Sequence, residues 1–368
     1  MKTILLVFGT RPEAIKMCPL VNELQARDCI RTIVCVTGQH RQMLDQVLNA
    51  FNVVPDYDLS IMKERQTLFH VTTNILNKVK EVLEKEKPDV VLVHGDTSTT
   101  FATALACFYL QIPGGHVEAG LRTYNLYSPY PEEFNRQVVS IIAAYNFAPT
   151  KLSRQNLIRE GKDPQTIYVT GNTAIDALKT TVHSNYYHEQ LEWAKGSRLI
   201  MITAHRRENL GEPMKHMFRA IRRVCDEHSD VKAIYPIHMN PIVRETANEI
   251  LGGDERIRII EPLDVVDFHN FLSQSYLILT DSGGIQEEAP SLGKPVLVMR
   301  DTTERPEGID AGTLKLVGTD EETIYNAFHL LLEDSAEYSK MSQASNPYGD
   351  GFASKRIADI LEYGRELS

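Results

Sequence analysis

The sequence predicts an α/β fold made of two Rossmann-like domains with a cleft between them. With 368 residues, the chain is longer than a single hydrophobic core usually organises. Short β-branched runs bounded by Gly, Pro or Asp alternate with longer amphipathic stretches, which is typical of parallel strands joined by helical crossovers. This alternation occurs twice, because a second series of strands and helices begins after Tyr168.

In the first half of the chain, β-branched runs of strand length alternate with longer segments whose apolar residues recur at helical spacing. The runs predict strands at Ile4–Phe8, Thr32–Val36, Val90–Val93, Gly115–Val117 and Asn146–Ala148. The segments between them predict helices at Glu13–Gln25, Arg41–Phe51, Leu68–Glu86 and Thr97–Leu110.

The second half repeats the pattern. Its predicted strands are Arg198–Ile202, Lys232–Pro236, Ile257–Ile260, Tyr276–Thr280 and Pro295–Val298, with helices at Met214–Glu227, Asn240–Leu251 and Ile285–Leu292. We therefore expect an N-terminal domain over residues 1–168 and a C-terminal domain over residues 169–351, with a short linker near Thr166–Gly171. Residues 352–368 are amphipathic, and we expect them to form a terminal helix that packs back on the N-terminal domain.

Composition limits the classes of function. An apolar content of 42% with 24% charged residues is ordinary for a packed, soluble protein. The formal net charge of −10 argues against nucleic acid or an anionic membrane as a partner, since both require an excess of Lys and Arg. The chain has no bilayer-length apolar segment, and Met1–Phe8 leads into no cleavage site, so we expect a cytoplasmic location. The five scattered cysteines favour reduced positions in the core.

Polar residues follow the predicted strands of the first half, at the edge where open α/β sheets bind ligands. The first strand ends in Gly-Thr-Arg-Pro-Glu, which makes Arg11 and Lys16 candidates for contacts to an anion. Asp96, Glu118 and Glu132 follow later strands. Each acid alone could cap a helix, but three at adjacent loops favour a cluster for general acid and base catalysis.

The second half places a basic segment and a glycine turn at strand ends. His205 precedes Arg206 and Arg207, a combination that suits contact with phosphate or a leaving group. The turn Ser282-Gly283-Gly284 lies between a strand and a helix, where backbone amides can approach a phosphate, and Glu288 then suits a ribose contact. The alternative for this turn is a plain helix cap.

Several common cofactor motifs are missing from the sequence. It contains no G-x-G-x-x-G and no G-x-x-x-x-G-K-[ST], so bound NAD and phosphate transfer from ATP both lose support. Asp56-Tyr57-Asp58 resembles the metal-binding D-x-D of some sugar transferases, but it follows Pro55 in a loop, which favours a surface turn. No His or Cys spacing suggests zinc, so we expect no metal and no external cofactor.

Taken in order, several segments closely resemble those of bacterial non-hydrolysing UDP-N-acetylglucosamine 2-epimerases, and the match covers nearly the whole chain. The segments are Phe8–Glu13, His94–Thr97, Gly115–Arg122, His205–Glu208, Asp281–Glu288, Arg300–Glu307 and Asn346–Gly351. The resemblance implies a glycosyltransferase-B-like fold and a homodimer. It also implies that UDP-N-acetylglucosamine and UDP-N-acetylmannosamine are interconverted for cell-surface polysaccharide synthesis, without a cofactor.

The resemblance also assigns residues to roles. The catalytic residues would be Asp96, Glu118, Glu132 and His205. The contacts to the nucleotide sugar would come from Arg11, Lys16, Phe268, Ser282, Gly283, Gly284, Glu288 and Arg305. In some bacterial members a second UDP-N-acetylglucosamine activates turnover, and the matching positions are Gln39, Gln42, Arg65, Glu132, Arg206 and His238. Gly38 and Gly114 depart from the family pattern, which has larger residues there.

The chemistry implied by this family explains why no NAD is needed. The C2–H bond of the sugar is not α to a carbonyl, so simple deprotonation would leave an unstabilised carbanion. Departure of UDP from the neighbouring carbon, coupled to proton loss, gives 2-acetamidoglucal, and re-addition of UDP completes the inversion. Three alternatives stay open: a hydrolysing epimerase that releases N-acetylmannosamine and UDP, a glycosyltransferase with an acceptor pocket, and a silent nucleotide-sugar sensor.

Overall fold

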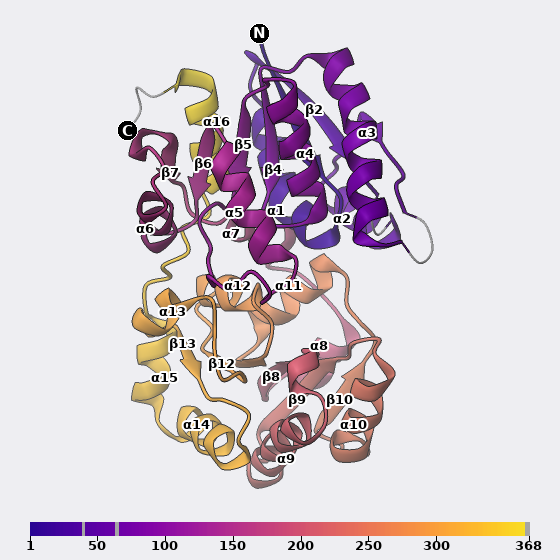
Figure 1. The fold of residues 1–368 in the computed structure, drawn as a ribbon. Coiled ribbons are helices and arrows are strands. Elements are labelled where there is room, and N and C mark those ends of the chain that lie inside the picture. The colour runs from indigo at the N-terminus through magenta and orange to yellow at the C-terminus, as the bar shows by residue number, and fades with distance from the viewer. Residues whose placement is uncertain (39–40, 63–65, 365–368) are drawn as a thin grey trace. The chain divides into compact units, whose positions relative to one another are not determined.

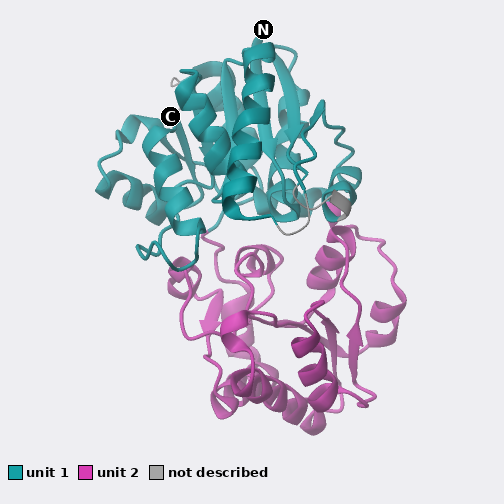
Figure 2. Cartoon of the chain, turned by 45° about the vertical axis from the view of Figure 1, so that its right-hand side comes forward, with its two compact units in different colours: residues 1–180, 348–368 teal, residues 181–347 magenta. Residues whose placement is uncertain are grey.

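The computed structural model describes residues 1–38, 41–62 and 66–364, apart from the side chains of residues 41 and 42. The chain forms two compact units, shown in Figure 2. Unit 1 comprises residues 1–180 and 348–368, and unit 2 comprises residues 181–347. Each unit is a parallel sheet with helices between its strands, so the predicted two-domain α/β fold is confirmed.

Unit 1 contains a seven-stranded parallel sheet of order β3-β2-β1-β4-β5-β6-β7. The strands are β1 (Lys2–Phe8), β2 (Ile30–Val36), β3 (Tyr57–Asp58), β4 (Val90–His94), β5 (Gly114–Val117), β6 (Tyr145–Ala148) and β7 (Ile167–Val169). The order reverses between β1 and β4, where Leu6 pairs with Val34 on one side and Leu92 on the other. In an open α/β sheet, loops at such a switch point bind ligands.

The helices of unit 1 follow the strands in alternation. They are α1 (Arg11–Gln25), α2 (Arg41–Ala50), α3 (Leu68–Glu86), α4 (Ser98–Tyr109), α5 (Glu132–Ile142), α6 (Lys151–Arg159), η1 (Pro164–Thr166), α7 (Thr173–Thr181) and α16 (Ala353–Tyr363). Helices α3, α4 and α5 lie side by side (Figure 1). Leu5, Val7 and Val91 from the central strands pack with α3 and α4, because these strands carry uninterrupted apolar runs.

The terminal helix α16 belongs to unit 1. The Arg27 guanidinium at the end of α1 binds Asp359 at 2.7 Å and Glu362 at 2.5 Å. Unit 1 ends later than the expected boundary at residue 168, because the segment around α7 is bound to the terminal segment of the chain. The Asn172 amide donates to the Tyr348 carbonyl at 2.8 Å. The Asp176 carboxylate accepts from backbone amides at the start of α16. For the same reason, residues 348–351 belong to unit 1 rather than to the second domain.

Unit 2 contains a six-stranded parallel sheet of order β10-β9-β8-β11-β12-β13. The strands are β8 (Arg198–Thr203), β9 (Val231–Pro236), β10 (Ile257–Ile260), β11 (Leu277–Thr280), β12 (Val296–Val298) and β13 (Leu314–Leu316). The helices are α8 (Glu189–Ala194), η2 (Arg207–Asn209), α9 (Glu212–Glu227), α10 (Pro241–Leu251), α11 (Val265–Gln274), α12 (Ile285–Ser291), α13 (Pro306–Asp310), α14 (Glu321–Glu333) and α15 (Ser335–Ser342). Because β8 and β11 are neighbours, the loops after Thr203 and Thr280 meet at one edge.

Every strand predicted from the sequence is present, with ends that shift by two residues at most. The short strands β3, β7 and β13 were not predicted, because two or three residues carry too weak a pattern. Across residues 1–38, 41–62 and 66–364, no helix combines the length and the apolarity needed to cross a bilayer.

Candidate active site

The loop after β1 is shaped by Gly9 and Glu13. A Cβ on Gly9 would lie only 1.7 Å from the Thr37 hydroxyl oxygen, so any other residue requires the Thr37 side chain to move. One Glu13 oxygen accepts from the amides of Gly9 (2.9 Å) and Thr10 (2.8 Å), and the other accepts from the Thr97 hydroxyl (2.6 Å). Burial raises the pKa of Glu13, against the effect of these hydrogen bonds. The start of α1, which carries Arg11, is therefore tied to the loop after β4.

Glu118 is held at the end of β5 in a left-handed backbone conformation, with φ of 66°. A non-glycine residue in this region costs about 1 kcal/mol or more, and such strain is concentrated at functional sites. Its carboxylate contacts the Lys16 ammonium, accepts from the Asn172 side-chain amide at 3.0 Å, and lies 3.7 Å from the His94 ring. Lys16 and Glu118, both predicted site residues, are thus brought together.

Two buried histidines support this region. Burial lowers the pKa of His94 to about 4, although the nearby Glu118 raises it, so the ring is neutral at pH 7. The Nε2 atom of His94 has no hydrogen-bond partner among the residues that the structure describes. His116 lies 2.7 Å from the Gly95 carbonyl through its own Nε2, and burial lowers its pKa to about 3. His116 therefore fixes the backbone immediately before Asp96.

Asp96 is positioned by α5. The Arg136 guanidinium pairs with the Asp96 carboxylate, and the Asn135 side-chain amide donates to the Asp96 carbonyl at 2.8 Å. Arg136 also lies 3.4 Å from Glu133, which is fully buried and accepts from the backbone of the preceding loop. Glu132 is only partly buried and has no partner among the described residues. Of the two adjacent glutamates, Glu133 is the structural one.

In unit 2, the buried Asp281 organises the loop that carries His205. One of its oxygens accepts from the backbone amides of His205 and Arg206, both at 2.9 Å, and from the Asn209 side-chain amide at 3.1 Å. The other lies 3.4 Å from the His205 Nδ1 atom. Asp281 has no role of its own among the residues predicted from the sequence. The signal that could have found it is an acid directly after a buried strand.

The glycine turn before α12 faces a cluster of charged side chains. A Cβ on Gly283 would lie 2.8 Å from the Arg305 guanidinium, so this position requires glycine unless the arginine moves. Arg305 is buried and donates to Glu287 at 2.7 Å and to Glu304 at 2.6 Å. Burial alone would raise the pKa of Glu304, but Arg305, Arg300, Arg206 and a backbone hydrogen bond together lower it to about 2.

The remaining predicted nucleotide contacts also lie in unit 2. Glu288 is mostly buried, and its carboxylate lies 3.6 Å from the His269 Nε2 atom. His269 in turn contacts the Thr181 hydroxyl at 2.7 Å, which fixes its ring. Phe268 precedes it on α11 and packs against the apolar core. Ser282 has its amide bound to the Thr280 hydroxyl at 2.9 Å.

The residues implied for an activator are described only in part. Gln39 and Arg65 lie outside the described residues, as does the side chain of Gln42, which belongs to α2. The His238 ring stacks on the His205 ring with centroids 5.2 Å apart. Arg206 donates to the Asp281 carbonyl at 3.0 Å.

The two glycines that we expect to depart from the family pattern differ in their surroundings. Gly38 has a φ of 68°, which favours glycine. A Cβ on Gly114 would meet nothing within 4 Å.

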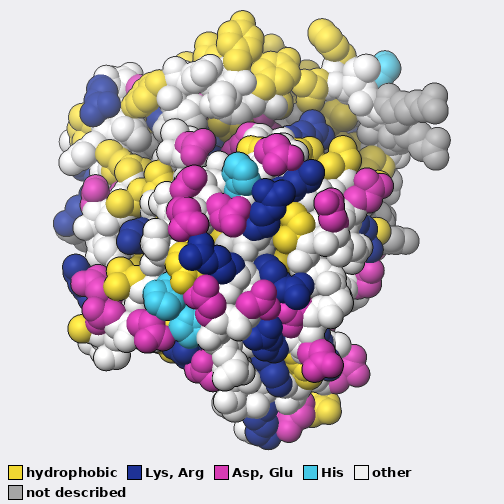
Figure 3. Space-filling view, turned by 90° about the horizontal axis from the view of Figure 1, so that it is seen from below, with side chains coloured by type: hydrophobic (Ala, Val, Ile, Leu, Met, Phe, Trp, Pro, Cys, Tyr) yellow, Lys and Arg dark blue, Asp and Glu magenta, His cyan; other side chains and the backbone are white. Residues whose placement is uncertain are grey.

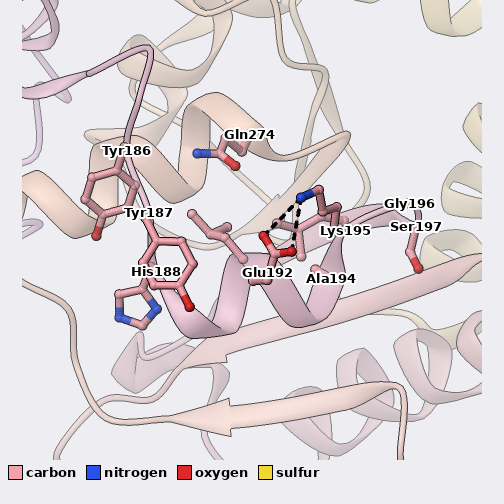
Figure 4. A pocket seen from close by; sticks show the side chains of 11 residues that line it. Tyr186, Tyr187, His188, Glu192, Ala194, Lys195, Gly196, Ser197 and Gln274 are labelled. Carbon is pink, nitrogen blue, oxygen red and sulfur yellow. Dashed lines mark hydrogen bonds and ion pairs between the residues drawn. The ribbon is translucent and has the colours of Figure 1, made fainter.

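A pocket elsewhere in unit 2 has a volume of about 350 Å³ (Figure 4). Its wall includes Tyr186, Tyr187 and His188 from the segment before α8, and Gln274 from α11. Glu192 and Lys195 pair at 3.0 Å on one side of it, at the end of α8, and both are exposed. None of the predicted site residues lines this pocket. On the face seen in Figure 3, acidic and basic side chains are interspersed.

Comparison with known proteins gives one consistent family. The family described as UDP-N-acetylglucosamine 2-epimerase matches residues 22–362. A UDP-N-acetylglucosamine 2-epimerase from Bacillus subtilis (strain 168) is 61% identical over 363 residues, which cover 98% of this chain and 96% of that protein. The S. aureus MnaA–UDP co-structure superposes with a TM-score of 0.92 at 56% identity, covering 100% of this chain and 98% of that one. The structure of the Neisseria meningitidis UDP-GlcNAc 2-epimerase bound to UDP-GlcNAc superposes with a TM-score of 0.90 at 50% identity, covering 98% of this chain and 99% of that one.

Proposed function

The chain belongs to the family of UDP-N-acetylglucosamine 2-epimerases, and from this premise we propose that it interconverts UDP-N-acetylglucosamine and UDP-N-acetylmannosamine without hydrolysis. In the proposed reaction the C2–H and C1–O bonds of the sugar break. The proton goes to a base of the protein, the electron pair of the C2–H bond forms a C1=C2 double bond, and UDP leaves with the electrons of the C1–O bond. UDP then adds back to 2-acetamidoglucal as C2 is protonated on the opposite face.

The observation that carries this proposal is the strained Glu118, paired with Lys16 and bound by Asn172. Lys16 and Asn172 hold the Glu118 carboxylate in place, as a base that must reach one particular C–H bond requires. We assign the base of the forward reaction to Glu118. Glu132, which has no partner among the described residues, is assigned as the acid for the other face, and Arg136 orients Asp96 beside the sugar.

The leaving diphosphate requires cations and amides that hold it until it returns. We assign this task to Arg11, His205, Arg305, the Ser282 side chain and the Gly283 and Gly284 amides, with Lys16 next to the reacting carbons. The Asp281 carboxylate supports this assignment, because it holds the backbone of His205 and lies 3.4 Å from the Nδ1 atom of the His205 ring. Glu288 accepts from the ribose hydroxyls, and Phe268 packs against the nucleoside.

The test is incubation with UDP-N-acetylglucosamine in D₂O, followed by NMR. Deuterium at C2 of UDP-N-acetylmannosamine, with no free sugar, is the expected result. Free N-acetylmannosamine together with UDP would instead identify a hydrolysing enzyme. Turnover that starts only when an acceptor is added would identify a glycosyltransferase, and binding without any turnover would identify a sensor.

We also propose a homodimer that a second UDP-N-acetylglucosamine activates, through Gln39, Gln42, Arg65, Glu132, Arg206 and His238. The stacking of His238 on His205 supports this, because a ligand on one ring would reach the other. With UDP-N-acetylmannosamine alone, turnover should show a lag that traces of UDP-N-acetylglucosamine abolish, and immediate full turnover would contradict activation. Analytical sedimentation measures whether the protein is a dimer.

The five free cysteines support a reducing, cytoplasmic location.

A further inference from the structure

Three metal-ligating side chains meet in unit 2, away from every residue assigned above. Helices α9 and α14 lie side by side (Figure 1). Glu227 ends α9, His228 follows it, and His329 lies on α14. One ligand atom from each of the three lies within 4.8 Å of the others. The histidines are a hundred residues apart in sequence, so no short spacing motif announces this cluster.

The two rings face each other through their nitrogens. The Nε2 atom of His228 lies 3.0 Å from the Nδ1 atom of His329, with ring centroids 5.1 Å apart. Two such nitrogens at this distance share either a proton or a cation. Zinc–imidazole bonds of about 2.0–2.1 Å that meet at 90° to 110° place their nitrogens roughly 2.9 to 3.4 Å apart. The distance between the two nitrogens therefore already fits a metal ion held by both rings.

The other ring nitrogen of His228 lies near a carboxylate that can support metal binding. Nδ1 lies 3.5 Å from a Glu333 carboxylate oxygen, and the side chain of His228 is only 10% exposed. A carboxylate on the far nitrogen is the usual support of a metal-binding histidine, because it fixes the ring and keeps the proton off the ligating atom. Glu333 lies one turn after His329 on α14, so the same helix supplies a ligand and a support.

Tyr325 positions the third ligand. Its hydroxyl donates to a Glu227 oxygen at 2.6 Å, and its ring stacks on the ring of His329 with centroids 5.5 Å apart. The cation nearest to Glu227 is Arg223, whose Nε lies 3.4 Å from the carboxylate. Arg223 also binds Glu322 at 2.7 Å, so it keeps an anionic partner when a metal draws on Glu227.

We propose that Glu227, His228 and His329 form a site for a divalent transition-metal ion of the zinc class, which fastens the end of α9 to α14. Two imidazoles and one carboxylate match this class, whereas Mg²⁺ and Ca²⁺ prefer all-oxygen sites. The exposed Glu227 leaves room for water as a further ligand. The site adds to unit 2 a stabilising element that is separate from the proposed epimerisation.

The test is calorimetric titration of the chelator-treated, full-length protein with ZnCl₂ alone, alongside the variants His329→Gln and His228→Gln. We expect the unaltered protein to bind one zinc ion per chain at this site. Each variant should bind zinc with an affinity at least about tenfold weaker. His70→Gln, which changes an exposed histidine on α3, is the matched control and should bind as the unaltered protein does. Zinc should also raise the melting temperature of the unaltered protein but not that of His329→Gln.

Two results would overturn the proposal: identical isotherms for the unaltered protein and both variants, or zinc binding that is lost equally in His70→Gln. Circular dichroism and epimerisation, which should stay unchanged in the variants, show that each has folded. Because the titration needs no substrate, a failure of this proposal is distinct from a failure of the proposed activity.

Discussion

The Lys16 ammonium of α1 contacts the Glu118 carboxylate at the end of β5, and Glu118 keeps this contact from a left-handed backbone conformation. Strain of this kind persists only where the surroundings over-determine it. Here the surroundings are Lys16, Asn172 and the neutral ring of His94. The same pairing is the reason that Glu118 is the base in our proposal.

Glu118→Gln should lower the rate of epimerisation by about 10² to 10⁴-fold, the usual contribution of a general base. Exchange of the C2 hydrogen in D₂O should fall with it, and the melting temperature should change little. Glu86→Gln is the matched control, because Glu86 is also 10% exposed and ion-paired but lies at the end of α3. Equal activity in both variants would remove Glu118 from the mechanism.

Gly9→Ala should destabilise unit 1 by about 1–3 kcal/mol, the usual cost of overpacking. The added methyl group would lie 1.7 Å from the Thr37 hydroxyl oxygen, whereas the methyl group of Gly114→Ala would meet nothing within 4 Å. Gly114→Ala should therefore leave the urea midpoint nearly unchanged. Both midpoints are measured by circular dichroism, and equal midpoints would contradict the clash.

Much of the fold could be predicted because its long central strands carry continuous apolar runs. Features that depend on contacts between residues distant in sequence could not be predicted. Asp281 supports His205 only because β8 and β11 are neighbours, although Asp281 and His205 are 76 residues apart in the chain. A sequence does not reveal such pairing directly.

The sequence indicated which types of residue form the candidate site better than it indicated the role of each residue. Glu132 and Glu133 are adjacent and chemically alike, and only burial separates a partly exposed acid from one bound into a loop. The boundary of unit 1 was missed for a similar reason, since hydrogen bonds from Asn172 and Asp176 to the distant terminal segment decide it.

The stability of the protein should fall as the pH falls below about 6.5, in part because of His94. Burial depresses the pKa of the folded-state ring to about 4, while the unfolded chain takes up a proton near pH 6.5. Stability from the neutral ring is thus fully present above pH 6.5 and is lost progressively as the pH falls towards 4. His94→Gln should flatten this part of the pH profile. The free energy of unfolding in urea, measured from pH 7 to pH 4, checks the slope, and parallel profiles would contradict it.

Asp281→Asn should raise the KM for UDP-N-acetylglucosamine and lower kcat by at least about tenfold, while costing about 1–3 kcal/mol of stability. The substitution keeps the size of the side chain but removes the charge that accepts the amides of His205 and Arg206, and it replaces one acceptor oxygen by a donor. Asp230→Asn is the control, because that carboxylate pairs with Arg198 near the surface. Steady-state kinetics separate the two effects: a merely structural Asp281 would lower the melting temperature while leaving KM unchanged. If inhibition by phosphate weakens in step with the rise in KM, Asp281 acts on binding of the diphosphate through the loop that it holds.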